Sequence, residues 1–337
     1  MFVSVERILH PEWKNKILIV GADMPRSVVS SADYTARNFG VKAGMPIFKA
    51  KELLHEKDVI FCPVHYEKYL EYSKMLKQEL IKYGKIEAFC GIDEFFLDAN
   101  DYLEKNNIQP YEFAKNIKEI IKTKIGLDLS IGISNCKWLA KFASNMNKNN
   151  ITEVYSQNIK NIWEYSVEKM LWIGKKTAEK LKKINVLTIG NLANCENVNE
   201  LQNIFGKKWN IMQNRAQGKE ENDFVDDKYK EIKSISKAQT FINDIYYNNK
   251  NVIDGIFRNL ISDVFSRLNF QKIKCRTISI TIRRNDFTTV TRSLSLRFPT
   301  NEYYLIYTSV ISLFMRLQNF KKIRLLGITL SNFSNNN

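Results

Sequence analysis

The order of strand and helix patterns in the final third of the chain limits the folds that this part can adopt. Between Ser234 and Phe333, several stretches alternate apolar and polar side chains with the two-residue period of a strand, as in RTISITIRR at 276–284. Stretches with helical spacing lie between them, at about 252–269 and 302–318. The order strand, helix, strand, strand, helix, strand predicts a small split βαβ domain.

The first 150 residues also mix strand and helix patterns, but in no regular order. Residues 14–21 have strand character, whereas 66–84 and about 111–125 have the spacing of amphipathic helices. Asp33 is placed to cap a short helix that ends near Gly40. This irregular alternation favours an α+β fold over a regular parallel α/β fold.

The sequence pattern in the middle of the chain, at about 151–227, predicts mostly short helices. Its stretch LWIGKKTAEKLKKINVLTIGNLA, at 171–193, predicts two helices around tight glycine turns. A charged stretch that is poor in apolar residues follows, at about 218–233, and we interpret it as a linker. The sequence therefore predicts a chain of several domains.

The balance of charge indicates the class of partner. The 337 residues include 51 Lys and Arg against 36 Asp and Glu, for a net charge of +15. Such a chain attracts polyanions, nucleic acid first and an anionic membrane surface second, although a merely basic protein has the same charge. We expect no membrane partner, because no apolar run reaches the roughly 18 residues that a membrane span needs.

The cysteines and histidines argue against a zinc site and against a disulfide framework. The five cysteines lie far apart with no CxxC pair, and the chain has three histidines. The first residues lack the pattern of a secretory signal peptide. We therefore expect a protein of the reducing cytoplasm.

Two adjacent acidic residues, Asp93 and Glu94, interrupt a stretch of strand composition. Neighbouring side chains on a straight strand point to opposite faces, so both can serve one site only if the chain bends, which Gly91 makes easy. Mg²⁺ takes one or two carboxylates together with substrate phosphate oxygens. The pair is therefore a candidate magnesium site, and a solvent-facing acidic hairpin tip is the alternative.

These residues belong to a set of motifs. The segment GIDEFFLD, at 91–98, resembles the palm motif S-I-D-E-x-[FY]-[LI]-D of Y-family DNA polymerases. VVSSADYTARNFGVKAGMP, at 28–46, is similar to the family's fingers motif, and GISNCKWLAKFASNMNKNN, at 132–150, to a later palm motif. Residues 233–241 and 323–333 resemble the entry and the last strand of its little-finger domain. The motifs follow the family order and cover nearly the whole chain.

The resemblance implies a multi-domain right-hand polymerase with palm, small fingers, a helical thumb that carries a helix-hairpin-helix, and a split βαβ little finger. The expected boundaries are 1–8 and 66–155 for the palm, 9–65 for the fingers, 156–226 for the thumb, 227–235 for a linker and 236–333 for the little finger.

The resemblance also implies roles for single residues. Asp93 would bridge two Mg²⁺ ions, and Glu94 would bind the ion that activates the primer 3′-hydroxyl. Tyr34 and Arg37 would hold the β- and γ-phosphates of the incoming dNTP. Lys148 would add a positive charge to the same triphosphate. Without the family pattern, the last three residues would be interpreted as ordinary surface side chains.

Two further residues are assigned to the nucleotide pocket. Ser31 would place a hydroxyl near the phosphates. The start MFVSVE resembles the end of the family's D-x-D-x-F-[FY]-A-S-V-E, the stretch that closes the first palm strand. Phe2 then falls on the residue whose ring excludes a 2′-hydroxyl, so dNTPs would be selected over rNTPs. The simpler interpretation of Phe2 is a core residue on the first strand.

The first Asp of that motif has no counterpart, because the chain begins at Met1. One interpretation is a start assigned at an internal Met, so that the natural protein is longer. The other is a catalytically impaired DNA-binding remnant of the same fold, since metal-binding acids act as a unit. Smaller departures at Gly91, Asn145 and Asn149 remove no charge that the chemistry needs.

Two regions are expected to contact DNA. The stretch at 171–184 resembles a helix-hairpin-helix with Trp172 where a first glycine is expected. Its turn would present backbone N–H groups to a phosphate, and the predicted contacts there are Gly174, Lys175 and Lys176. Arginines beside Ser and Thr on little-finger strands suit a duplex backbone; the predicted contacts there are Arg283, Arg284 and Arg292.

Taken together, the resemblance implies an error-prone translesion DNA polymerase. It would add dNTPs to a primer 3′-end on template DNA with two Mg²⁺ ions. We expect a monomer in the cytoplasm, associated with the nucleoid. A sliding clamp is a further candidate partner, although no clear clamp-binding peptide ends the chain.

Overall fold

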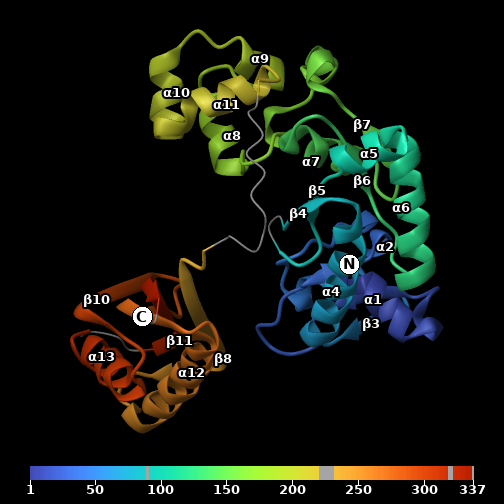
Figure 1. Cartoon of the computed structure of the whole chain (residues 1–337). Helices are drawn as coiled ribbons and strands as arrows, with labels where there is room; N and C mark the ends of the chain where they lie inside the picture. Colours follow the sequence, from blue (N-terminus) through green and yellow to red (C-terminus); the bar gives the residue numbers. More distant parts are fainter. Residues whose placement is uncertain (89–90, 220–230, 318–321, 336–337) are drawn as a thin grey trace. The chain divides into compact units, whose positions relative to one another are not determined.

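The structure is a computed structural model that describes residues 1–88, 91–219, 231–317 and 322–335 (Figure 1). The chain divides into two compact units. The first comprises Met1–Ala22 and Val29–Tyr229, and the second comprises Asp23–Val28 and Lys230–Asn337. Of the linker predicted at 227–235, residues 227–230 lie outside the described part, and strand β8 already begins at Ser234.

The segment expected to form the fingers contains a small three-stranded sheet. Strand β1 (Ile17–Val20) lies in its centre, antiparallel to β2 (Ser31–Ala32) and parallel to β3 (Val59–Cys62). Helices α2 (Tyr34–Asn38) and α3 (Ile47–Leu53) follow β2 and supply apolar side chains to a core with β1. Strand β2 is the shortest of the three, with two residues.

The palm segment is built around three helices. They are α1 (Phe2–Leu9), α4 (Tyr66–Leu80) and α6 (Pro110–Ile125). They share one buried core with β1. The placement of Phe2 at the end of a strand was wrong, because Phe2 opens α1. The reason is that Val3, Val5 and Glu6 are buried at helical spacing.

Two pairs of short strands complete the palm segment. The antiparallel pair is β4 (Lys85–Ala88) with β5 (Phe95–Asp98), and the parallel pair is β6 (Ile131–Ile133) with β7 (Ile151–Glu153). Helices α5 (Asn100–Asn106) and α7 (Lys137–Met146) complete this segment. Short 3₁₀ turns cover Pro11–Trp13, Ile81–Tyr83, Ser156–Ile162, Val167–Lys169 and Gly206–Lys208.

The thumb segment consists of short helices, as predicted, which gather into one group in Figure 1. They are α8 (Lys175–Lys182), α9 (Ile189–Ala193), α10 (Val198–Phe205) and α11 (Trp209–Ala216). Their apolar faces form one core with the buried face of α7, including Trp138.

The second unit has the predicted order of elements. Its strands are β8 (Ser234–Tyr246), β9 (Ile273–Arg284), β10 (Thr289–Thr300) and β11 (Lys322–Asn335), and its helices are α12 (Lys250–Phe270) and α13 (Tyr303–Met315). The strands form an antiparallel sheet in the order β10-β9-β11-β8. Both helices contribute to one core with this sheet. The α+β class and the split βαβ domain are therefore confirmed. Among the described residues, no helix combines the length and the apolar character that crossing a membrane requires.

Candidate active site

One cavity of about 940 Å³ in the first unit brings together six of the seven residues that the sequence assigned to the metal and nucleotide sites. It is lined by residues from Met1 to Tyr155, so side chains about 150 positions apart in the chain meet there. The predicted site residues on its wall are Ser31, Tyr34, Arg37, Asp93, Glu94 and Lys148.

The acidic pair lies on the connection between β4 and β5. Gly91 has a φ of +137°, and the chain bends from there to Asp93 before β5 begins. Both carboxylates line the cavity and remain partly exposed, with 42% of the Asp93 side chain and 38% of the Glu94 side chain accessible. The predicted bend at Gly91 is thus confirmed, and it allows neighbouring residues to face one site.

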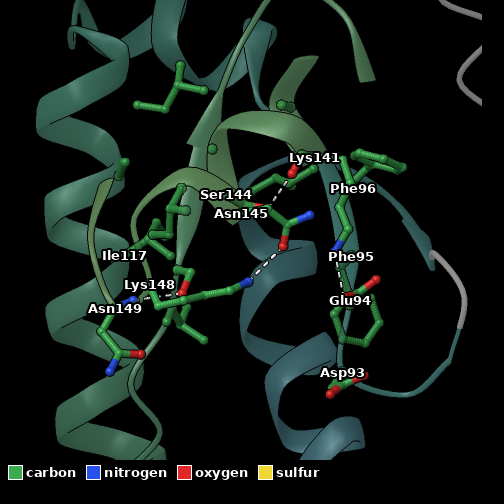
Figure 2. Close-up of a pocket in the computed structure, with 18 of the residues that line it drawn as sticks. Asp93, Glu94, Phe95, Phe96, Ile117, Lys141, Ser144, Asn145, Lys148 and Asn149 are labelled. Atoms are coloured by element: carbon green, nitrogen blue, oxygen red, sulfur yellow. Dashed lines mark hydrogen bonds and ion pairs between the residues drawn. The ribbon is translucent and has the colours of Figure 1, made fainter. Parts of the chain in front are cut away.

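Glu94 is paired with a lysine that sequence reasoning did not select. The Lys141 ammonium lies 2.5 Å from Oε1 of Glu94, and 16% of the Lys141 side chain is exposed. Figure 2 shows Lys141 reaching from α7 toward the Glu94 carboxylate. One turn earlier on α7, Lys137 forms a second ion pair, 2.7 Å from Oε2 of Glu87. The spacing of four residues on one helix was the available signal.

Lys148 follows the end of α7 and projects into the same cavity. Its ammonium donates to Oδ1 of Asn145 at 2.7 Å (Figure 2). Burial, and next the ammonium of Lys141, lower the pKa of Lys148, while Glu94 acts in the opposite direction. Asn145, a departure from the family pattern in the sequence, thus orients the lysine.

Asp33 determines where α2 begins. Its Oδ1 accepts from the Ala36 N–H at 2.7 Å, which caps the helix as predicted. Its Oδ2 accepts from the Leu18 N–H at 3.0 Å and lies 2.7 Å from the Arg7 guanidinium. The carboxylate is buried and therefore ties α2 to β1 and to α1. The sequence predicted the cap but not the ties to Leu18 and Arg7.

Tyr34 and Arg37 extend from this anchored helix. Arg37 donates from Nε to the Ala32 carbonyl at 2.9 Å, and its guanidinium lies 5.8 Å from the centre of the Tyr34 ring. Tyr34 is 52% exposed. The pair therefore presents a hydroxyl and guanidinium donors to the cavity, which suits phosphate oxygens.

Phe2 has a different environment from the other predicted nucleotide contacts. Its ring stacks on Tyr69, with centroids 4.2 Å apart and an angle of 19° between the planes. The Tyr69 hydroxyl donates to the buried carboxylate of Glu6, to which His65 is also bonded. Within the described ranges, Phe2 is not one of the cavity-lining residues, although Met1 and Val3 are. Its role in sugar selection stays a prediction.

The donor set at the acidic turn fits a hard divalent cation. Among the described residues, no three His, Cys, Asp or Glu side chains gather into a closed metal cluster. Two carboxylates beside open space for a triphosphate match the preference of Mg²⁺ for a few carboxylates plus substrate oxygens. Asp93 also lies beside the start of α1, 3.9 Å from the Met1 nitrogen.

The predicted thumb contacts lie at one turn. Gly174 is the N-cap residue of α8, and Lys175 and Lys176 occupy the first two helical positions. Trp172, where the family pattern has glycine, takes the left-handed φ of +69° that a glycine would adopt easily. The turn thus has the predicted geometry in spite of the changed residue.

The predicted little-finger arginines do not share one face of their sheet. Arg283 lies on the same face of β9 as the hydroxyl residues Ser279 and Thr281, and it donates to Oγ1 of Thr289 at 3.0 Å. Arg284 has the same parity as the buried isoleucines of β9, and Arg292 pairs with Ile280. The contact role of all three remains a prediction.

Known proteins resemble the chain over nearly its full length. A family model described as the impB/mucB/samB family matches residues 1–145, and its C-terminal domain matches 232–337. DNA polymerase IV of Ureaplasma parvum serovar 3 is 34% identical over 335 residues, 98% of this chain and 91% of that protein. DNA polymerase IV 1 of Bacillus subtilis is 31% identical over 332 residues, which cover 97% of this chain and 78% of that protein.

Solved structures agree with these relatives. The Y-family DNA polymerase chimera Dbh-Dpo4(243-245)-Dbh has a TM-score of 0.86 at 25% identity, covering 99% of this chain and 97% of its own. An insertion ternary complex of Dbh DNA polymerase has the same fold, with a TM-score of 0.67 at 24% identity and the same coverage. The chain therefore belongs to the Y family of DNA polymerases and is a DNA-directed DNA polymerase of the DNA polymerase IV and UmuC-like kind.

Proposed function

We propose that this chain is an error-prone translesion polymerase that adds dNTPs to a primer 3′-end by a two-metal mechanism. The observation that carries the proposal is the single cavity into which the fingers and the palm bring two carboxylates and several cationic or hydroxyl donors. Nucleotidyl transfer needs this combination, because negative charge develops on the attacking and leaving oxygens.

The carboxylates of the cavity would bind metal ions, and its cationic and hydroxyl groups would bind phosphates. Asp93 and Glu94 would hold a pair of Mg²⁺ ions, which stabilise an in-line displacement at phosphorus. Tyr34, Arg37 and Lys148 would bind the β- and γ-phosphates, and the Asp33 anchor would keep the first two in position. Ser31 would add a hydroxyl beside them. Aligning the triphosphate in this way accelerates the reaction by orientation as well as by charge.

Primer extension with the purified protein tests the proposal. Asp93→Ala should reduce nucleotide addition by at least about 10³-fold with either Mg²⁺ or Mn²⁺, because the carboxylate would ligate the metal ions directly. Asp101→Ala, which removes an exposed carboxylate of α5, is the matched control and should retain activity. Unchanged activity of the Asp93 variant would refute the site assignment.

A second candidate function is a DNA-binding protein of the same fold without polymerase activity. The observation in its favour is that the described residues contain no cluster of three possible metal ligands at this site. It predicts that the protein binds primed DNA but adds no nucleotide even with Mn²⁺. The same experiment therefore separates the two functions.

The remaining expectations concern partners. The substrates would be primed template DNA and dNTP, and the protein would act as a monomer on the nucleoid DNA of the cytoplasm. A sliding clamp is a candidate for recruiting it. Comigration with a clamp in gel filtration, compared with the protein alone, would test recruitment and the monomeric state together.

A further inference from the structure

The thumb carries an exposed tryptophan in a backbone conformation that disfavours large side chains. Trp172 has a φ of +69°, and left-handed backbone costs a non-glycine residue about 1–2 kcal/mol. Core packing does not offset this cost, because Trp172 is 52% exposed whereas its neighbours Met170 and Ile173 are buried. The turn before α8 uses this conformation, yet a glycine would adopt it without the cost, so the exposed ring at this position calls for a reason other than core packing.

The indole has a cationic partner. The guanidinium of Arg215, at the end of α11, lies 3.9 Å from the centre of the Trp172 ring, within the range of a strong cation–π contact. The stack holds a planar apolar surface and a phosphate-binding group side by side. Such a pair fits a sugar-phosphate backbone, because the ring can pack on a deoxyribose while the guanidinium reaches the adjacent phosphate.

The surroundings favour a polyanion over a protein partner. Helix α8, which begins two residues after Ile173, has the sequence KKTAEKLK, with four lysines and one glutamate. Lys175 and Lys176 are exposed on its first turn. A lysine-rich surface beside an aromatic ring is poorly suited to protein interfaces, whose centres are depleted of lysine.

We propose that Trp172 and Arg215 form a contact surface for the duplex part of the DNA, the ring packing on a sugar and Arg215 binding a phosphate. This inference rests on the proposed function, since it assumes primed DNA as the substrate, and goes beyond the phosphate contact expected at Gly174. It assigns DNA binding to the Trp172 side chain, which replaces a glycine of the helix-hairpin-helix pattern, and to Arg215, which lies outside that pattern.

Glycine at position 172 separates a binding role from a structural one. Trp172→Gly removes the ring and suits the left-handed backbone, so the melting temperature should not fall. The Kd for a fluorescein-labelled primed duplex, measured by anisotropy, should rise by about fivefold, the worth of one exposed cation–π or stacking contact. Asn185→Gly is the matched control, because Asn185 is also an exposed thumb residue, with a φ of +59°, and its replacement should leave Kd unchanged.

The salt dependence of DNA binding by Arg215 variants tests the proposal independently. Arg215→Gln should reduce the slope of log Kd against log salt concentration by about one, as expected for the loss of one phosphate contact. Arg215→Lys should keep the slope and lose part of the affinity, since a lysine retains the charge but stacks less well. An unchanged slope in the Gln variant would overturn the role of Arg215.

The outcomes decide between the alternatives. If Trp172→Gly binds DNA as tightly as the natural sequence, the proposal is wrong. If Trp172→Gly unfolds more easily, Trp172→Asn is measured next, because Asn also tolerates this backbone; a loss of stability in both variants would show a structural role and would likewise overturn the proposal. If the natural protein binds no primed DNA at all, the proposed function itself fails, which distinguishes the two.

Discussion

The ammonium of Lys141 lies 2.5 Å from Oε1 of Glu94, so one of the two carboxylates of the acidic turn is already matched by a positive charge. A metal ion that binds Glu94 has to displace this ammonium or share the carboxylate with it. The pair therefore holds Glu94 in the cavity and competes with the metal at the same time.

Removing the Lys141 charge should strengthen metal binding. Because a partly exposed ion pair contributes up to about 1 kcal/mol, Lys141→Gln should raise the affinity for Mn²⁺ by about twofold to fivefold. Titration of Mn²⁺ by electron paramagnetic resonance measures this directly. Lys137→Gln is the control, since Lys137 pairs with Glu87, which is not among the described cavity-lining residues. Weaker Mn²⁺ binding by the Lys141 variant would contradict this prediction.

Asp33 should be worth more to stability than an exposed aspartate. Asp33→Ala removes a helix cap and leaves the Leu18 N–H and the Arg7 guanidinium without this acceptor, at a cost of about 2–4 kcal/mol. Asp58→Ala breaks the exposed pair with Lys16, in which 72% of the Asp58 side chain is accessible, and should change stability little. Urea denaturation of the two variants should give clearly different midpoints. Equal midpoints would show that Asp33 does not anchor α2.

Nucleotide affinity should depend on pH through Lys148. Burial lowers the pKa of Lys148 below its ordinary value of 10.5, so the ammonium loses its proton earlier than a free lysine does. Its attraction for a triphosphate is therefore lost at a lower pH than the attraction of an ordinary lysine would be. Lys148→Arg should keep its affinity, because a guanidinium stays charged. The dNTP affinities of the natural protein and of Lys148→Arg are measured by equilibrium titration from neutral pH to about pH 10. If the two affinities change with pH in parallel, Lys148 is not the titrating group.

Phe2 should control the choice of sugar if it lies against the incoming nucleotide. Phe2→Ala should then raise the incorporation of rNTPs relative to dNTPs by at least about tenfold, the equivalent of removing one strong steric restriction. Phe48→Ala, which removes a 60% exposed ring of α3, is the control. Since Phe2 stacks on Tyr69, an unchanged ratio would indicate that the ring serves core packing alone.

Adjacent arginines of β9 should differ in DNA binding. Arg283 shares the face of the hydroxyl residues, whereas Arg284 points the other way. Arg283→Gln should therefore reduce the salt slope of DNA binding by about one, and Arg284→Gln should leave it unchanged. Anisotropy titrations at several salt concentrations measure both slopes. Equal effects of the two substitutions on the salt slope would show that DNA does not contact the Arg283 face of the sheet in preference to the Arg284 face.

The elements that the sequence predicted best are those with a repeating local pattern. Helices α4 and α6 and the order of the second unit follow from the spacing of apolar residues, because burial on one face imposes that spacing. Phe2 was misplaced on a strand, since too few residues precede it to show any period. Of the linker predicted at 227–235, residues 227–230 lie outside the described residues.

The sequence by itself determined the family, the acidic pair, the bend at Gly91 and six of the residues that line the cavity, because each has a local signature in residue type and spacing. Only the tertiary structure decided that Lys141 pairs with Glu94, that Asn145 holds Lys148 and that Arg283 and Arg284 diverge. These relationships depend on which elements pack together and on which face each side chain emerges. The linear order of residues does not carry that information until hydrophobic burial brings distant elements together.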